Sequence, residues 1–152
     1  MNTLGIRVKS SSVIIVIYDF EHNSIVNVEE IKIPKALSIP EALKYVRNTI
    51  LDILREFQIN KAGLRIVESY SQTLSLRRIE IEGVIQEAFA SSMLAAYFCG
   101  QISTIAAKLK IPRADFKRYV DGVKDYEGVE NWANHNKNEK EAILTALGAV
   151  NA

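Results

Sequence analysis

An acidic residue follows a short apolar segment in the middle of the chain. Residues 62–72 read AGLRIVESYSQ, and the apolar side chains of Leu64, Ile66 and Val67 predict a buried strand that ends at Glu68. In open α/β sheets, ligands usually bind beyond the carboxyl ends of the strands. Glu68 is therefore a candidate site residue, and a carboxylate that caps the following polar turn is the alternative.

Basic side chains gather later in the chain. Arg113, Lys117 and Arg118 form a local group that could contact a phosphate backbone, or that could be the solvated face of a short helix. Tyr126 and Trp132, in the polar stretch after this group, could stack on unpaired bases, although sealing the core is the more ordinary role of such a tryptophan.

Composition excludes several classes of protein. The chain has 152 residues, 48% of them hydrophobic, which predicts a single domain over 1–152 with a proper core. The 19 basic and 18 acidic residues nearly balance, so no global field attracts polyanions. One cysteine and two distant histidines provide neither a disulfide framework nor a zinc site. No membrane span or signal peptide is apparent, and we expect a cytoplasmic protein.

Hydrophobic periodicity predicts an α/β fold. Three alternating segments indicate an antiparallel meander, and the rest of the chain alternates between helical and strand-like patterns. Small residues in the longest predicted helix would allow close packing against the sheet or against a second copy of the protein. The predicted strands are 3–9, 12–20, 25–33, 64–67 and 102–110, and the predicted helices are 40–59, 76–98, 113–120 and 139–150.

This order resembles the ribonuclease H-like fold, in particular the RuvC-like branch of Holliday-junction resolvases. The resemblance implies a mixed five-stranded sheet, with three antiparallel strands followed by parallel strands, flanked by helices. It also implies carboxylates from the first strand, the fourth strand and the last helix that hold Mg²⁺ or Mn²⁺ for phosphodiester cleavage. The resemblance depends on four motifs: Leu4-Gly5-Ile6, Ile66-Val67-Glu68, Ile111-Pro112 with Phe116-Lys117, and Lys140-Glu141-Ala142-Ile143-Leu144.

The sequence departs from this family at its first catalytic position. Arg7 stands where the family has an aspartate, and a guanidinium cannot ligate a metal ion. Arg7 placed between Glu68 and Glu141 would make fork-shaped bonds to one or both of these remnant acids and would supply the positive charge of the ions. In the alternative, Glu68, Glu139 and Glu141, with Asp19, hold one Mg²⁺ or Mn²⁺ while Arg7 contacts phosphate.

Three functions follow from these alternatives. The first is a catalytically degenerate RuvC-like domain that binds nucleic acid or a protein partner and forms a homodimer through residues 76–98. The second is an active endonuclease that depends on Mg²⁺ or Mn²⁺ and cuts branched or structured nucleic acid. The third is a structural or regulatory subunit with no nucleic-acid role. For the first, the predicted phosphate contacts are Arg113, Lys117, Arg118 and, by the resemblance, Arg77.

Overall fold

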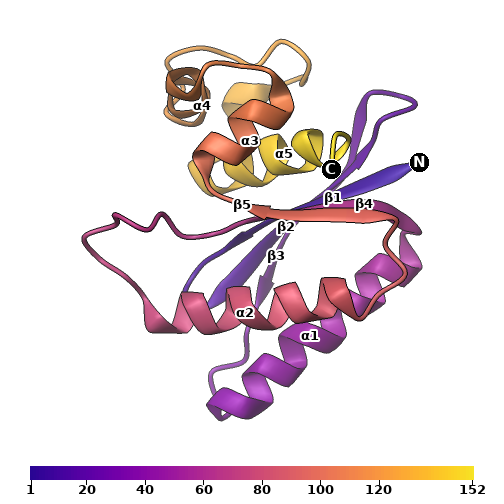
Figure 1. The fold of residues 1–152 in the computed structure, drawn as a ribbon, viewed down its shortest axis with the longest axis vertical. Helices are drawn as coiled ribbons and strands as arrows, with labels where there is room; N and C mark the ends of the chain where they lie inside the picture. The colour runs from indigo at the N-terminus through magenta and orange to yellow at the C-terminus, as the bar shows by residue number, and fades with distance from the viewer.

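A mixed sheet of five strands runs through the middle of the computed structural model, which describes residues 1–152 (Figure 1). The strand order is β3-β2-β1-β4-β5. The strands β1, β2 and β3 pair with one another in antiparallel fashion, and β4 and β5 continue the sheet in parallel with β1. The predicted fold class is therefore confirmed. The strands are β1 (Asn2–Val8), β2 (Ser12–Asp19), β3 (Ser24–Lys32), β4 (Ile59–Arg65) and β5 (Ala96–Gly100).

Helices cover both faces of the sheet (Figure 1). Both faces of β2 are thus buried, which explains its unbroken apolar run: Ile15 faces the core under α1 and α2, and Ile14 faces the core under α5. None of the helices combines the length and the apolar composition that crossing a bilayer requires. The α-helices are α1 (Ile39–Glu56), α2 (Leu76–Ala90), α3 (Ile102–Leu109), α4 (Arg113–Val120) and α5 (Lys137–Ala149).

Local sequence signals set the start of α1. The Ser38 hydroxyl accepts a hydrogen bond from the Glu41 backbone N–H, and the Glu41 carboxylate accepts one from the Ser38 N–H. This capping box satisfies backbone donors that the helix leaves free, and Pro40 fits the first turn because its missing N–H is not needed there. The helix begins where the sequence predicted.

A close approach between α5 and β1 positions the candidate site. A Cβ on Gly5 would overlap the backbones of Ala142 and Ala146, with the Ala146 Cα at 2.8 Å. Thr3 adds a buried hydrogen bond from its hydroxyl to the Ala146 carbonyl, at 2.7 Å. Only a strand with glycine at this position can lie so near a helix backbone. The middle of α5 is thereby held against β1, and Glu141 lies next to this contact on the helix.

Three predicted elements were wrong. The helix predicted over 76–98 ends at Ala90, and its last residues form β5, which pairs with β4. The strand predicted over 102–110 is α3, because Ile105 and Ala106 are buried while the residues around them reach the surface at helical spacing. The central strand, predicted over 64–67, is β4 (Ile59–Arg65), so Ile66 and Val67 lie beyond it. The helix predicted over 40–59 accordingly ends earlier, at Glu56.

The polar stretch before α5 is a folded loop that closes the core. Trp132 lies in the short 3₁₀ helix Trp132–Asn134 and is 2% exposed. Its Nε1 donates to the Tyr119 carbonyl at 3.0 Å, and its ring packs near those of Tyr119 and Tyr126. The structure therefore places Trp132 in the core, where its ring cannot stack on a base.

Candidate functional site

The parallel pairing of β1 with β4 brings two arginines side by side. Arg7 and Arg65 are direct partners in the register of these strands, close to the carboxyl end of each. Ile6 and Leu64, the residues just before them, face the core under α1 and α2, so alternation turns both arginines toward α5. A pair of guanidiniums thus lies at the edge where α/β sheets bind their ligands.

Glu141 on α5 lies between these two arginines. Arg7 Nε donates to one carboxylate oxygen at 3.0 Å, and Arg65 Nε donates to the other at 3.1 Å. All three side chains are largely buried, with Arg65 only 7% exposed. Two buried cations and one buried anion cost desolvation energy, which close charged hydrogen bonds offset. Both oxygens of Glu141 are therefore occupied by protein donors.

Glu68 lies just beyond β4 and bonds to the start of α3. Its Oε1 accepts from the Ile102 backbone N–H at 2.8 Å and lies 3.6 Å from Arg65 Nη2. A carboxylate at this position satisfies a free N–H of the helix and interacts favourably with its dipole. Gln101 reinforces the junction by donating from Nε2 to the Val67 carbonyl at 3.1 Å. The Glu68 carboxylate therefore caps the start of α3 and not the polar turn that follows it, and it also lies beside Arg65 in the charge cluster.

A second ion pair from α2 extends the cluster. Glu82, also buried, accepts from the Val67 backbone N–H at 3.0 Å and from Arg78 Nε at 2.6 Å. Burial lowers the pKa of Arg78, and the nearby charges of Arg7 and Arg65 lower it further. Around the ends of β1 and β4, three guanidiniums therefore meet three carboxylates.

Sequence reasoning did not assign Arg65, Arg78 or Glu82 to this charge cluster. A signal existed for each of them. Arg65 interrupts the apolar run 64–67, and a buried charge in such a place requires a partner. Arg78 and Glu82 have the spacing of a helical ion pair. The sequence did not show that these residues come together at one end of the sheet.

This set of side chains does not fit a divalent ion. Metal-dependent cleavage of a phosphodiester needs several carboxylates whose free oxygens converge on the metal ions. Here Glu141 gives both oxygens to arginines, and no group of three or more histidine, cysteine, aspartate or glutamate side chains lies close enough to hold a metal ion.

The other proposed metal ligands lie elsewhere. Glu139 belongs to the capping box at the start of α5, where its Oε1 accepts from the Asn136 backbone N–H at 2.9 Å. Asp19 pairs with Asn2 at the opposite end of β1 and bonds to His22 at 2.6 Å. The structure therefore brings together Glu68, Glu141 and Arg7, and it does not bring Glu139 or Asp19 to them.

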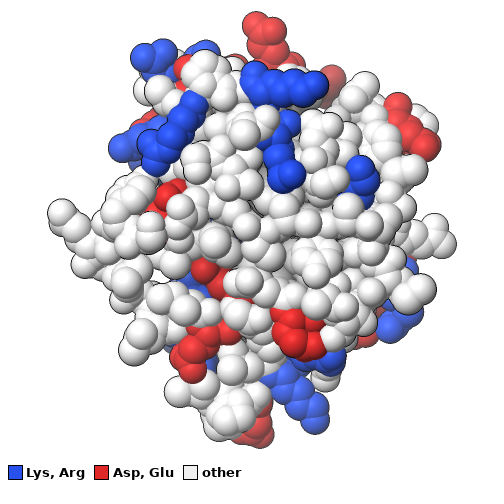
Figure 2. Space-filling view, in the orientation of Figure 1, with Lys and Arg blue, Asp and Glu red and all other residues white.

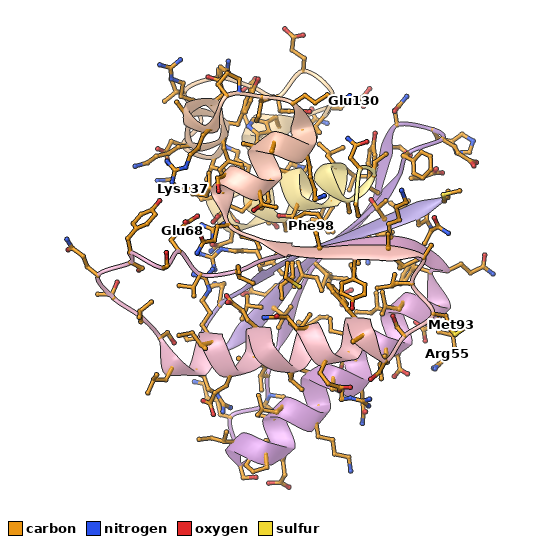
Figure 3. The ribbon with its side chains drawn as sticks, in the orientation of Figure 1. Arg55, Glu68, Met93, Phe98, Glu130 and Lys137 are labelled. Carbon is orange, nitrogen blue, oxygen red and sulfur yellow. The ribbon has the colours of Figure 1, made fainter.

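A cleft of about 920 Å³ opens next to the charge cluster. Glu68 and Lys137, which both line it, lie on the same side of the molecule (Figure 3). Figure 2 shows Lys and Arg side chains gathered over α4, which forms one wall. The charged lining residues are the cations Arg7, Arg113, Lys117, Arg118 and Lys137 and the acids Glu68, Asp121 and Glu141.

The charges of the cleft favour an anionic ligand. Five cations face three acids, and Glu68 and Glu141 are already paired with arginines. Asp121 is 3.5 Å from Lys137 Nζ, while Lys117 has no ion pair with the protein. Three of the four predicted phosphate contacts line this cleft. The fourth, Arg77 on α2, does not line the cleft. Lys137 lines it but was not among the predicted phosphate contacts.

The fold is similar to that of solved Holliday-junction resolvases. RuvC from Thermus thermophilus, solved in complex with a Holliday junction substrate, is 15% identical to this chain with a TM-score of 0.73, over 99% of this chain and 94% of that one. The yeast mitochondrial Holliday junction resolvase is 16% identical with a TM-score of 0.57, over 98% of this chain and 77% of that one. No protein-family model and no curated protein sequence matches the chain.

These likenesses define the class of the fold. The chain has a ribonuclease H-like fold of the RuvC-like type, as the sequence predicted.

Proposed function

We propose that this chain is a catalytically degenerate RuvC-like domain that binds nucleic acid in the cleft beside α4 and does not cut it. The observation that carries this proposal is the pairing of both Glu141 oxygens with Arg7 and Arg65. A carboxylate engaged in this way has no free oxygen for a catalytic ion. The fold is retained, and the charge that metals would supply comes from guanidiniums.

Two observations support nucleic acid as the ligand. The cleft has an excess of cations, and its basic wall is formed by one short helix, so several phosphates of a backbone could be contacted together. RuvC from Thermus thermophilus, whose fold this chain shares, was solved with a Holliday junction. The same cleft could accept a branched or a single-stranded substrate.

A nuclease assay tests the loss of catalysis. The purified protein is incubated with Mg²⁺ or Mn²⁺ and with four-way junctions, single strands and RNA–DNA hybrids. We expect no cleavage above that of the Glu68→Gln variant. Metal-dependent cutting by the natural protein that this variant loses would overturn the proposal and would identify an active endonuclease.

A binding assay tests the cleft. We expect retention on DNA or RNA to weaken as salt rises, and Lys117→Ala to reduce the slope of log affinity against log salt by about 0.7 to 0.9, the value for one phosphate contact. Lys44→Ala is the matched control, because Lys44 is an exposed lysine on α1, on the opposite face of the sheet. Absence of binding to any nucleic acid would favour a structural or regulatory subunit.

We also propose that the protein forms a homodimer through the outer face of α2. Leu76 is 77% exposed and Ile79 is 38% exposed, and an added Cβ on Gly83 would meet no atom within 4 Å. A glycine inside a helix costs about 1 kcal/mol relative to alanine, and nothing within this chain requires it. Sedimentation tests the proposal: we expect a dimer that Gly83→Arg converts to a monomer.

A further inference from the structure

We propose that Arg7 binds a phosphate group of the nucleic acid at the inner end of the cleft, in place of a divalent ion. This inference rests on the proposed nucleic-acid binding and assigns one contact within it. Arg7 lines the cleft together with Lys117 and Arg113. A phosphate there would meet one guanidinium from the sheet and cations from α4.

Arg7 has donors left for such a ligand. A guanidinium carries five N–H groups. Arg7 Nε donates to Glu141 and Nη1 donates to the Val8 carbonyl, while Nη2 has no protein partner and is not among the buried atoms that lack one. The side chain is 15% exposed, so the free end reaches the cleft while the rest is held in place. A fixed guanidinium with an open edge is well suited to bind phosphate.

Arg65 provides an internal comparison. It bonds to the same carboxylate through Nε, donates from Nη1 to the Ile66 carbonyl and has Nη2 near Glu68. It is more buried than Arg7 and does not line the cleft. The two arginines therefore share a partner and a position in their strands, but only Arg7 can contact a ligand.

The acids of the site do not oppose a phosphate at this point. In a site with bare carboxylates, an incoming phosphate is repelled unless cations lie between the two. The two guanidiniums of Arg7 and Arg65 balance the two carboxylates of Glu141 and Glu68, and Glu68 also accepts a hydrogen bond from the start of α3. Binding should therefore need no metal ion. Added Mg²⁺ should weaken it, because the ion competes for phosphate as any counterion does.

The experiment compares Arg7→Gln with Arg65→Gln. Affinity for a fluorescent single-stranded oligonucleotide and for a four-way DNA junction is measured by anisotropy over a salt series, with EDTA or with Mg²⁺. We expect Arg7→Gln to weaken binding by about tenfold to a hundredfold, as for a lost hydrogen bond between charged groups. We expect its salt slope to fall by about 0.7 to 0.9. Both variants should lower the melting temperature, and Arg65→Gln should keep the salt slope of the natural protein.

Different failures point to different errors. An unchanged slope in Arg7→Gln, with a reduced slope in Lys117→Ala, would overturn the role of Arg7 and leave binding in the cleft intact. Tight binding only with Mg²⁺ would also overturn it. No binding by the natural protein would overturn both proposals. If Arg7→Gln does not fold, the Arg7→Lys variant replaces it in the test. The lysine ammonium keeps the charge but not the shape of the guanidinium, so we expect the salt slope to be retained and the affinity to fall. An unchanged affinity would contradict a specific contact of the Arg7 guanidinium with phosphate.

Discussion

Arg7 and Arg65 are neighbours across the parallel strands β1 and β4, and their Nε atoms donate to opposite oxygens of Glu141. This arrangement makes the carboxylate the centre of a buried triad. The two cations would repel each other without the acid between them, and the acid would be costly to bury without them. The triad therefore fixes the ends of two strands and the start of α5 relative to one another.

The first prediction concerns the acid of the triad. Glu141→Gln removes the charge that compensates two buried guanidiniums, so we expect a loss of about 3 to 5 kcal/mol in the free energy of unfolding. Urea denaturation followed by circular dichroism measures it. Glu139→Gln, on the same helix, is the control: glutamine keeps an acceptor for the Asn136 N–H in the capping box, so the variant should cost less than about 1 kcal/mol. Equal losses in the two variants would contradict the central role of Glu141.

The second prediction concerns the ion pair from α2. Either Arg78→Met or Glu82→Gln alone leaves a buried charge without its partner, while the double variant removes both charges and keeps an acceptor for the Val67 N–H. We expect the double variant to lose less stability than the sum of the single losses, with a coupling of about 1 to 3 kcal/mol. The double-mutant cycle is measured by urea denaturation, and strict additivity would show that the pair does not interact.

The third prediction compares two glycines. Gly5→Ala places a methyl group against the α5 backbone, which cannot yield without moving the helix, so we expect a loss of at least about 3 kcal/mol and weaker binding of nucleic acid. Gly83→Ala adds its methyl group in open space on α2 and should gain about 0.5 to 1 kcal/mol in the monomer. Thermal and urea denaturation measure both changes.

Each glycine variant has an outcome that would contradict the structure at its position. A stable Gly5→Ala protein would contradict the close approach of α5 to β1. A monomer destabilised by Gly83→Ala would contradict the open outer face of α2, and a weakened dimer with a stabilised monomer would support dimerisation there.

The fourth prediction concerns the single cysteine. Burial in β5 and the nearby Glu82 raise the pKa of the Cys99 thiol to about 11. An ordinary thiol has a pKa of about 8.5, so at pH 8 the thiolate is rarer by roughly two hundredfold and alkylation should be slower by a similar factor than in the urea-unfolded chain. Rates with iodoacetamide in the two states check this.

The same shift predicts a dependence of stability on pH. The thiol ionises at lower pH in the unfolded chain than in the folded one, so its contribution to stability is complete below about pH 8.5 and is lost as pH rises toward 11. Cys99→Ala should remove this part of the decline. An unchanged decline in the Cys99→Ala variant would contradict this contribution. For the alkylation experiment, equal rates in the folded and unfolded protein would show that the thiol is not shielded.

Local sequence patterns predicted most elements of the fold. The buried run of β2 and the capping box of α1 act within a few residues, so they are readable without the structure. The region after α2 was misread because β5 is short and α3 is apolar enough to imitate a strand. In such segments, pairing with β4 and packing on α5 decide the conformation, and neither is encoded locally.

The sequence by itself determined that position 7 carries a guanidinium, that Glu68 follows a strand and that α5 begins with acids. Tertiary structure decided which charges meet. Arg65 reaches Glu141 only because β4 pairs in parallel with β1 and because Gly5 lets α5 approach the sheet. Glu139 points away from the triad because the helical period directs its side chain to the N-cap, where it accepts from the Asn136 N–H. Electrostatic energy depends on distance in space, and the register of a sheet and the docking of a helix set those distances.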